Sequence, residues 1–398
     1  MLPVDHLPWL SLSYREVAME LKKAGIRPLT LPISINQMDN ANPVQIKISE
    51  KIPEDAAYYA VAVEAEVSSF DTKKEHTERL EHWRRKLSMM ICEIEKALAR
   101  NSINLMVVVQ GYEPLNAVAR FVAIKQNIPV LSIENTALAS CMLWDNISGI
   151  TTNKNLARNY FWKYHGVFQD AAISEFKNTF QRNLRQAKSV EHTSPIGVLF
   201  SGSHRPIVLF LGQVLTDSSI IFGTGKWGSP LKLIESLCYW CNKNNHQLII
   251  KLHPKESIGK NTINNSPYNK LTYRKIQQSE DLINLLIKNE AVIDANNDYD
   301  TYALIKNACF AVTVNSQAGL EASLLGTPVV VAGEAFYSGL GFTIDAPEPR
   351  SVNDQFNEAT NWSVPKSAAE FSYIFFEHYC KPKTATSLAK LIVENVSN

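Results

Sequence analysis

Short apolar runs alternate with amphipathic stretches along the second half of the chain. The runs are rich in Val, Ile, Leu and Phe, and they lie at 206–211, 247–253, 291–294 and 308–314. Runs of this length and composition predict strands that are buried on both faces of a parallel sheet. The stretches between them, at 228–243 and 299–307, have helical spacing, so the pattern predicts an α/β fold.

The clearest strand–helix–strand unit lies at 308–332. Its first strand is followed by Asn315 and Ser316, which are typical residues at a helix start, and the helix ends at Gly326. The loop at 333–341 then carries glycines and aromatic residues. Because this helix begins at the carboxyl end of a strand, we expect a ligand site there. Free backbone N–H groups at a helix start suit a phosphate or a carboxylate.

The first half of the chain shows the same alternation less regularly. Helices are predicted at 14–24, 73–101 and 114–126, and strands at 58–67, 104–110 and 128–133. The strand at 58–67 is predicted from the alternating pattern YYAVAVEAEV. A polar helical stretch follows at 170–193, and two more helices are predicted at 368–378 and 384–396. We therefore divide the chain into an α/β domain at 1–169, a connector at 170–195, a Rossmann-like domain at 196–365 and terminal helices at 366–398. Whether these helices cross back to the first domain is left open.

The composition fits two domains with apolar cores. The chain has 398 residues, of which 45% are hydrophobic and 20% charged, and its formal net charge is +1. A nucleic-acid-binding protein usually shows a strong basic excess, so nucleic acid is not expected as a partner. The six cysteines are scattered, and Cys238 and Cys241 lie on one amphipathic helix without a second pair. We interpret them as reduced core residues.

The sequence contains no candidate membrane-spanning segment. No apolar run approaches the roughly 18 residues needed to cross a bilayer, and the first residues are too acidic and too rich in proline for a signal peptide. We expect a cytoplasmic protein, and peripheral association with the inner face of the inner membrane is left open. The chain could be a standalone protein or one module of a larger one.

The first candidate site residues are Lys251 and His253. They lie two residues apart at the end of the apolar run LIIKLH, so they share one face of the strand, and Pro254 forces a turn after them. A His donor and a Lys charge suit a nucleotide phosphate. The alternative is a solvated Lys and a His that is satisfied by the backbone.

Two carboxylates also follow predicted strands. Asp217 lies in the segment GQVLTDSS after the run PIVLFL, where it could be a nucleophile, a base or a helix cap; Asp before Ser-Ser is more often a cap. Glu134 closes the strand at 128–133 and could act as a general base on an acceptor hydroxyl. Alternatively, Glu134 is a charge that meets solvent where the sheet ends.

One segment matches a metal-binding sequence motif, but its position in the chain does not suit a metal site. Asp298-Tyr299-Asp300 has the DxD form of metal-dependent glycosyltransferases, but it lies in the loop DANNDYD before a helix. We interpret it as a helix cap. No other metal cluster is evident in the sequence, so no metal cofactor is expected.

Three of these segments, in this order, resemble the capsule polysaccharide biosynthesis family. They are RPIVLFLGQVLTDSSI at 205–220, LIIKLHPKE at 248–256 and VTVNSQAGLEASLLGTPVVVAGEAFYSGLGFT at 312–343. The shared pattern is GQ followed by Asp-x-Ser, then Lys-x-His-Pro, then Ser-x-x-Gly-x-Glu-Ala and Phe-Tyr-x-Gly-x-Gly-x-Thr. The family includes the retaining β-Kdo transferases of Gram-negative bacteria.

The resemblance implies a GT-B-like fold, with two Rossmann-like domains and a cleft between them. It implies CMP-Kdo as the donor, bound by the second domain without metal, and an acceptor site in the first domain. Asp217 matches the nucleophile of a double displacement, Glu134 would be the acid/base, and His253 would steady the leaving phosphate. The implied donor-binding residues are Gln213, Ser219, Lys251, Asn315, Ser316, Gly319 and Glu321. Arg205, Lys226 and Gln213 are candidates for the donor's own carboxylate.

The resemblance therefore predicts a retaining β-Kdo transferase. The acceptor would be a glycan or a lipid-linked glycan of the bacterial surface, either capsule or lipopolysaccharide O-antigen. Two alternatives stay open. The first is a sialyltransferase-like inverting enzyme that uses another CMP-sugar. The second is a non-catalytic glycan-binding or export-associated protein.

Overall fold

The chain forms two compact α/β units. The computed structural model describes residues 1, 12–30, 51–70, 76–136, 138–147, 154–187, 197–200, 205–261 and 263–396. Unit 1 comprises Met1–Ala65, Phe70–Leu156 and Phe376–Asn398, and unit 2 comprises Glu66–Ser69 and Ala157–Phe375. The α/β class is confirmed, with one sheet in each unit. The chain enters unit 2 at Ala157 and leaves it at Phe376, whereas the sequence placed the corresponding borders at 169 and 365.

Unit 2 is built on a parallel sheet of six strands in the order β6-β5-β4-β7-β8-β9. The strands are β4 (Ile207–Leu211), β5 (Gln247–Lys251), β6 (Val292–Asp294), β7 (Ala308–Thr313), β8 (Val329–Val331) and β9 (Ile344–Asp345). Every residue of β4 and β5 is buried. This is why these segments read as continuous apolar runs, since helices cover both faces of the sheet.

The helices of unit 2 include five that the sequence predicts, near 170–193, 228–243, 299–307 and 368–378 and between Ser316 and Gly326. They are α6 (Lys154–Tyr164, which begins in unit 1), α7 (Asp170–Ala187), α8 (Gly197–Phe200), α9 (Ser218–Gly223), α10 (Pro230–Lys243), α11 (Lys255–Ile258), α12 (Leu271–Gln277), α13 (Glu280–Asn289), α14 (Thr301–Asn307), α15 (Gln317–Leu324), α16 (Val352–Ala359) and α17 (Ser367–Tyr373). A π-helical turn at Ile374–Tyr379 continues α17. The sequence had not predicted α6, α8, α9, α11, α12, α13 and α16.

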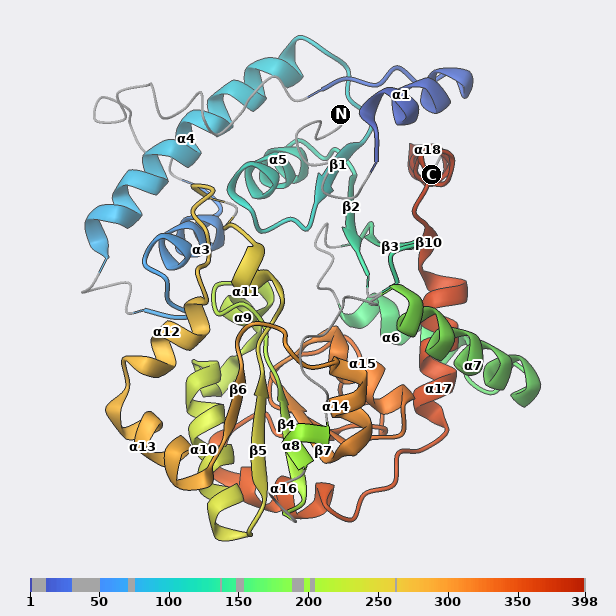
Figure 1. The fold of residues 1–398 in the computed structure, drawn as a ribbon. Helices are drawn as coiled ribbons and strands as arrows, with labels where there is room; N and C mark the ends of the chain where they lie inside the picture. The colour runs from blue at the N-terminus through green and yellow to red at the C-terminus, as the bar shows by residue number, and fades with distance from the viewer. Residues whose placement is uncertain are drawn as a thin grey trace. The chain divides into compact units, whose positions relative to one another are not determined.

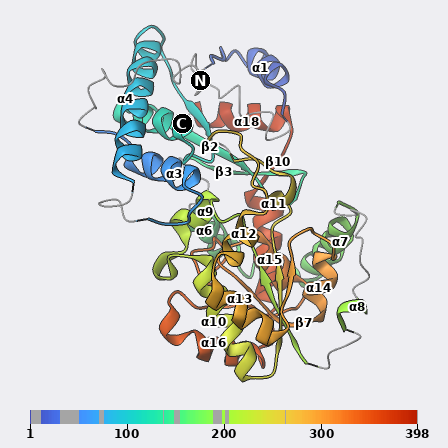
Figure 2. The same cartoon turned by 60° about the vertical axis from the view of Figure 1, so that its left-hand side comes forward.

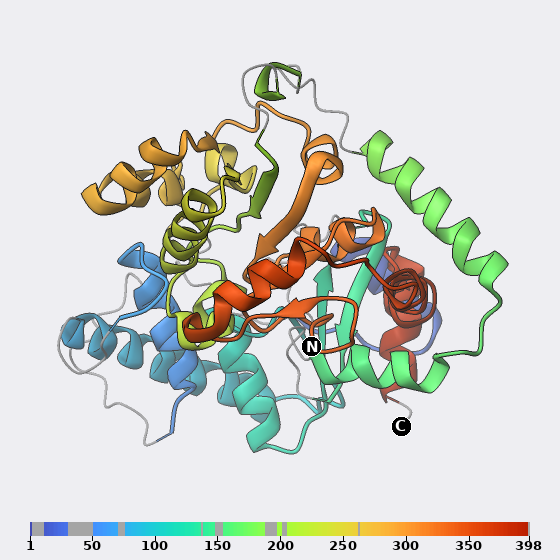
Figure 3. The same ribbon diagram turned by 90° about the horizontal axis from the view of Figure 1, so that it is seen from below.

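The two faces of this sheet can be followed from strand β7. Phe310 packs edge-on against Trp240 of α10 and stacks on Phe356 of α16. Thr313, three residues further along the strand, instead faces Gly319 of α15. Side chains alternate between the two faces of a strand, so α10 and α16 cover one face and α15 covers the other. Figure 3 shows unit 2 from below, with the orange strand β7 running between these helices.

Unit 1 has a smaller sheet in the order β1-β2-β3-β10. Its strands are β1 (Met106–Val109), β2 (Val130–Asn135), β3 (Cys141–Asp145) and β10 (Lys381–Pro382). Strands β1 and β2 are parallel, joined through α5 (Pro114–Lys125), whereas β3 and β10 run antiparallel to their neighbours. The link between β2 and β3 spans five residues, too few for the crossover that a parallel pair needs. Unit 1 is thus Rossmann-like only in its β1-α5-β2 part.

The end of the chain belongs to unit 1. Strand β10 pairs with β3, and α18 (Ala385–Val396) packs against α1 (Tyr14–Lys23). Figures 1 and 2 both show these two pairs side by side. Trp144 of β3 donates its indole N–H to the carbonyl of Tyr379 at 2.8 Å, which fastens the returning segment. The remaining helices of unit 1 are α3 (Glu54–Glu64) and α4 (Thr77–Ala99).

The predicted strand at 58–67 is wrong, because this segment lies mostly in helix α3. Glu54 and Asp55 occupy the first turn of α3, where acidic residues stabilise a helix, and the helix contains four alanines. Seven of its eleven residues are buried on several sides of the helix. Burial around the whole helix removes the polar face, so the alternation of small and large apolar residues imitated a strand.

Two smaller expectations concern membranes and thiols. Within the described residues, the helices lack the combination of length and apolarity needed to cross a bilayer. All six cysteines are free. Cys238 and Cys241 are fully buried, which confirms that they are core residues, and burial raises the pKa of the Cys238 thiol to about 11. Cys380 is buried as well, whereas Cys141 and Cys309 are half-buried and Cys92 is exposed, so three of the six thiols lie in the core.

Candidate functional site

The strand order of unit 2 reverses between β4 and β7. From β4 the chain moves to β5 and β6 on one side, and then returns to β7 on the other side. In open parallel sheets, ligands bind outside the carboxyl ends of the strands at such a reversal. The segments that follow β4, β5 and β7 therefore form the candidate site. Figure 1 shows α9, which follows β4, and α11, which follows β5, at the same end of the sheet.

A chain of hydrogen bonds joins the ends of β4 and β7. Gln213 accepts from the backbone N–H of Asn315 at 3.2 Å and donates to the Ser219 hydroxyl at 2.9 Å. The Ser219 hydroxyl donates to Asp217 Oδ1 at 2.8 Å. The Asn315 amide group closes the circle by donating to the Ser219 carbonyl at 2.7 Å. The structure thus brings together four predicted site residues, which are 102 positions apart at the most.

Asp217 is the N-cap of α9. Its Oδ1 accepts from the backbone N–H of Ser219 at 2.9 Å as well as from the Ser219 hydroxyl. The cap interpretation of Asp217 is therefore correct for one carboxylate oxygen. The other oxygen, Oδ2, accepts no hydrogen bond from the described residues. Asp217 is half-buried, so Oδ2 is available to a ligand at the sheet edge.

Ser316 is the N-cap of α15 and is nearly buried. Its hydroxyl oxygen accepts from the backbone N–H of Ala318 at 3.2 Å, while the hydroxyl hydrogen makes no hydrogen bond with the described residues. Asn315 Oδ1, next to it, is buried without a hydrogen-bond partner in the described part of the chain. A buried acceptor without a partner is uncommon in folded proteins and indicates that a ligand or water donates to it.

The backbone N–H groups at the start of α15 are less available than the sequence suggested. The N–H of Asn315 donates to Gln213, that of Ser316 donates to the Thr313 hydroxyl at 3.2 Å, and that of Ala318 donates to Ser316 Oγ. The N–H of Gly319 donates to the Ser316 carbonyl at 3.0 Å. A phosphate at this helix start would have to compete with these bonds.

Close packing holds α15 in place. A Cβ atom on Gly319 would collide with the Tyr337 hydroxyl, which itself donates to the Ser316 carbonyl. Tyr337 is completely buried, and burial raises the pKa of its hydroxyl above the ordinary value. Gly319 therefore acts by its lack of a side chain, which lets Tyr337 reach the loop before the helix.

Lys251 has three hydrogen-bond partners inside the protein. Its ammonium group donates to Asp294 Oδ2 at 2.5 Å, Asn297 Oδ1 at 2.6 Å and the Tyr299 carbonyl at 2.9 Å. A lysine has three donors, so none is left for a donor phosphate in this structure. Burial lowers the pKa of Lys251, while the bond to Asp294 opposes that shift. Lys251 thus supports the loop after β6, and its predicted contact with the donor has no geometric support.

His253 has a defined tautomer. Its Nδ1 accepts from the backbone N–H of Lys255 at 3.1 Å, so a neutral ring carries its hydrogen on Nε2. The ring is half-buried and comes directly after β5. In this neutral form Nε2 is the donor nitrogen of the His253 ring.

Glu321 is a structural carboxylate. It is buried and accepts from the Tyr302 hydroxyl at 2.8 Å, a contact that joins α15 to α14. Burial raises the pKa of that Tyr302 hydroxyl. The geometry gives Glu321 a role in packing these two helices and does not place it with the groups at the sheet edge.

Glu134, the predicted acid/base, belongs to unit 1, and the other nine predicted site residues belong to unit 2. It lies near the carboxyl end of β2, is half-buried, and accepts from Gln110 Nε2 at 2.8 Å. Gln110 directly follows the parallel neighbour β1. The predicted position of Glu134 at a sheet edge is therefore correct, and its role stays a prediction.

The DxD segment behaves as a cap. Asp300 is the N-cap of α14 and accepts from the backbone N–H of Ala303 at 2.6 Å, which confirms the interpretation from the sequence. Nowhere in the described ranges do three or more His, Cys, Asp or Glu side chains come together in a way that could hold a metal ion.

Two residues of the site region were missed by the sequence analysis. Glu256 is fully buried and accepts from the backbone N–H and the hydroxyl of Thr272, and burial raises the pKa of its carboxyl group. The Thr313 hydroxyl donates to the Leu211 carbonyl at 3.0 Å and so ties β7 to β4. Thr313 is a polar residue inside an apolar run, in the segment VTV at 312–314, and this pattern could have marked it as a candidate.

Comparison with known proteins identifies one family. The model of the family described as capsule polysaccharide biosynthesis protein matches residues 151–379. No curated protein matches the chain. Among solved structures, the KpsC beta Kdo 2,7 transferase of Thermosulfurimonas dismutans is 17% identical, covering 76% of this chain and 89% of that chain, with a TM-score of 0.47. The beta Kdo 2,4 transferase of the same KpsC is 16% identical, covering 73% and 86%, with a TM-score of 0.48. The UDP-GlcNAc 2-epimerase of Methanocaldococcus jannaschii is 14% identical, covering 81% and 96%, with a TM-score of 0.37.

Proposed function

The chain belongs to the capsule polysaccharide biosynthesis protein family, and from this membership we propose that it is a retaining β-Kdo glycosyltransferase. It would move Kdo from CMP-Kdo to a glycan or lipid-linked glycan acceptor of the bacterial surface, without a metal cofactor. The membership itself supports a role in making a surface polysaccharide. The donor, the retaining course and the covalent intermediate are parts of the proposal.

One observation carries the proposal. Asp217 Oδ2, the Ser316 hydroxyl hydrogen and Asn315 Oδ1 have no hydrogen-bond partners among the described residues, while the groups around them are joined to one another. A nucleophilic oxygen, a donor and an acceptor therefore stand at one sheet edge. A glycosyl phosphate offers an electrophilic carbon, phosphate oxygens and amino or hydroxyl hydrogens to such a set.

The proposed chemistry has two displacements. Asp217 Oδ2 attacks the anomeric carbon of the donor sugar and forms an ester, while the bond from that carbon to the phosphate oxygen breaks and CMP leaves. His253 Nε2–H and the Ser316 hydroxyl would stabilise the charge on the departing phosphate. An acceptor hydroxyl then loses its proton to a base and displaces Asp217 from the sugar. Two inversions give net retention, and Glu134 keeps its predicted role as that base.

The double role of Asp217 allows a sharp experiment. Asn caps a helix about as well as Asp, so Asp217→Asn keeps the bond to Ser219 but removes the nucleophile. We expect the wild-type protein, incubated with CMP-Kdo, to gain the mass of one sugar residue and to release CMP. Asp217→Asn should show no adduct, and its transfer rate should fall by about 10⁴-fold or more. Intact mass spectrometry and CMP release, both measured in EDTA, test this.

A matched control uses the other capping aspartate. Asp300 caps α14 in the same way and has no proposed chemistry, so Asp300→Asn should keep both the adduct and the transfer rate. CMP release that requires acceptor, with no adduct in any slowed variant, would indicate a single displacement by an inverting enzyme. Failure to bind or release CMP would contradict the enzyme proposal and leave a glycan-binding protein. Loss of all activity in EDTA would contradict metal independence.

A further inference from the structure

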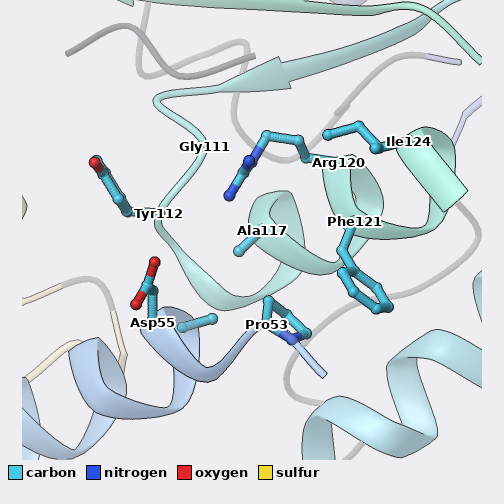
Figure 4. A pocket seen from close by; sticks show the side chains of 9 residues that line it. Pro53, Asp55, Gly111, Tyr112, Ala117, Arg120, Phe121 and Ile124 are labelled. Carbon is cyan, nitrogen blue, oxygen red and sulfur yellow. The ribbon is translucent and has the colours of Figure 1, made fainter. Parts of the chain in front are cut away.

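Unit 1 contains a pocket that no part of the proposed donor chemistry uses. It has a volume of about 150 Å³ and lies between the first turn of α3, the helix α5 and the turn after β1 (Figure 4). Its lining residues are Pro53, Asp55, Ala56, Gly111, Tyr112, Ala117, Arg120, Phe121 and Ile124. Its position at the carboxyl end of β1, beside the parallel strand β2, is where such a sheet can bind a ligand.

Arg120 is the cation of this pocket. In Figure 4 its side chain extends from α5 across the pocket towards the Gly111–Tyr112 turn. Its Nε is buried without a hydrogen-bond partner, and the guanidinium group makes no hydrogen bond or ion pair with the described residues. Burial lowers the pKa of Arg120, and Tyr112 and Asp55 oppose that shift only in part. A partly desolvated guanidinium group without a partner indicates that a ligand anion completes the site.

The turn that forms one wall of the pocket is held in an unusual conformation. Gln110 and Gly111 have φ angles of 61° and 99°, and a residue other than glycine pays a steric cost in this region. Gln110 is fixed there by its side-chain bond to Glu134 and by its backbone N–H, which donates to the Ile133 carbonyl at 3.1 Å. Because these bonds hold the turn, Tyr112 is placed at the pocket without support from a ligand.

The second charged group of the pocket is Asp55. It lies in the first turn of α3, is exposed, and forms no ion pair with Arg120. The walls between the two charges are apolar side chains, namely Pro53, Ala117 and Phe121. Arg120 can hold a carboxylate through two parallel hydrogen bonds, and Asp55 can accept hydrogen bonds from hydroxyl groups. Asp55 also disfavours a doubly charged phosphate more than a carboxylate, because its own charge repels both.

We propose that this pocket binds one acidic sugar unit, with its carboxylate on Arg120 and a hydroxyl group on Asp55. As a subsite for the acceptor glycan it rests on the proposed function, whereas the binding of an acidic sugar does not. The pocket lies within unit 1, so its chemistry can be tested without transfer, CMP-Kdo or any group of unit 2.

Binding of simple sugars to the full chain tests the proposal. Galacturonate, galactose and inorganic phosphate are the probes. Saturation-transfer NMR titrations give the affinities of the two sugars, and competition against galacturonate gives that of phosphate. We expect galacturonate to bind the wild type and galactose to bind at least about tenfold more weakly, because galactose lacks the charge that Arg120 recognises. Arg120→Gln should weaken galacturonate by a similar factor, and Arg120→Lys should fall between, since it keeps the charge without the planar fork.

Lys125→Gln is the matched control, because it removes an exposed positive charge from the same helix outside the pocket. Its galacturonate affinity should equal that of the wild type. Equal binding of galacturonate by Arg120→Gln and the wild type would overturn the proposal, as would phosphate binding tighter than galacturonate. An intact pocket with galacturonate binding but no transfer activity would contradict only the proposed function.

Discussion

Two basic residues, one in each unit, show how differently a positive charge is used in this molecule. Lys251 of unit 2 is buried with three hydrogen-bond partners, and its partner Asp294 is also completely buried. Arg120 of unit 1 lies in a pocket and has no such partner in the described part of the chain. Burial lowers the pKa of both side chains. Among the described residues, only Lys251 of these two has its charge balanced by hydrogen bonds and an ion pair.

This difference distinguishes a charge that stabilises the fold from a charge that can bind a ligand. A charge whose hydrogen bonds are all made inside the protein fixes the shape of a loop and has nothing left for a ligand. A desolvated charge without partners is unfavourable until a ligand supplies them. By this criterion Lys251, which a motif placed in the donor site, is structural. Arg120, which no motif marked, is the better candidate for ligand contact.

The largest expected effect on stability comes from replacing Lys251, whose charge is paired with Asp294. Lys251→Met leaves Asp294 buried without its cation and should lower the free energy of unfolding by about 3–5 kcal/mol, measured by denaturant titration. Lys226→Met is the control, since Lys226 is exposed and pairs with Glu348 at the surface, where little change is expected. A small loss for Lys251→Met would mean that the loop after β6 does not depend on this lysine.

A smaller effect on stability is expected at Gly319, where packing against Tyr337 leaves no room for a side chain. Gly319→Ala would force α15 away from Tyr337 and should cost about 1–3 kcal/mol of unfolding free energy. Gly197→Ala is the control, because nothing lies near the position of its added methyl group. Combining Gly319→Ala with Tyr337→Phe should recover part of the loss. If stability does not recover, the Tyr337 hydroxyl is not the obstacle. The contrast between the tightly packed start of α15 and the pocket around Arg120 would then lose support.

The smallest effect on stability is expected for Arg120, which makes no hydrogen bond with the described residues. Arg120→Met removes a desolvated group that bonds to nothing in the described structure, so the unfolding free energy should change by less than about 0.5 kcal/mol or should rise. Thermal and denaturant unfolding of the variant measure this. If the unfolding free energy falls by more than about 2 kcal/mol, Arg120 stabilises the fold, and the argument that it binds a ligand no longer holds.

Local patterns predicted most strands of unit 2. The strands β4, β5 and β7 are continuous apolar runs, and the cap of α14 at Asp300 follows from an Asp in an Asn-rich loop. The same reasoning failed for α3, where burial on several sides hid the helical period. Periodicity reports which positions are buried, and it cannot distinguish a strand from a helix that has no polar face.

The positions of the candidate residues were therefore easier to predict than their bonds. Asp217 and Ser316 were correctly placed at the ends of strands, because a strand followed by a capping residue is a local signal. The sequence could not show that Gln213 and Asn315 are hydrogen-bonded to one another, since 102 residues separate them. Nor could it show that Glu321 faces Tyr302 instead of the sheet edge.

By itself, the sequence determined the α/β class, the strands β4 to β8 of unit 2 and the carboxylates and hydroxyls that follow its strands. Each depends on residues a few positions apart, through hydrophobic period and helix capping. Only the tertiary structure decided that the last residues return to β3 and that Lys251 makes all three of its hydrogen bonds inside the protein, while Arg120 makes none with the described residues. The partners of a charge come from distant parts of the chain, so whether it supports the fold or awaits a ligand is decided when those parts meet.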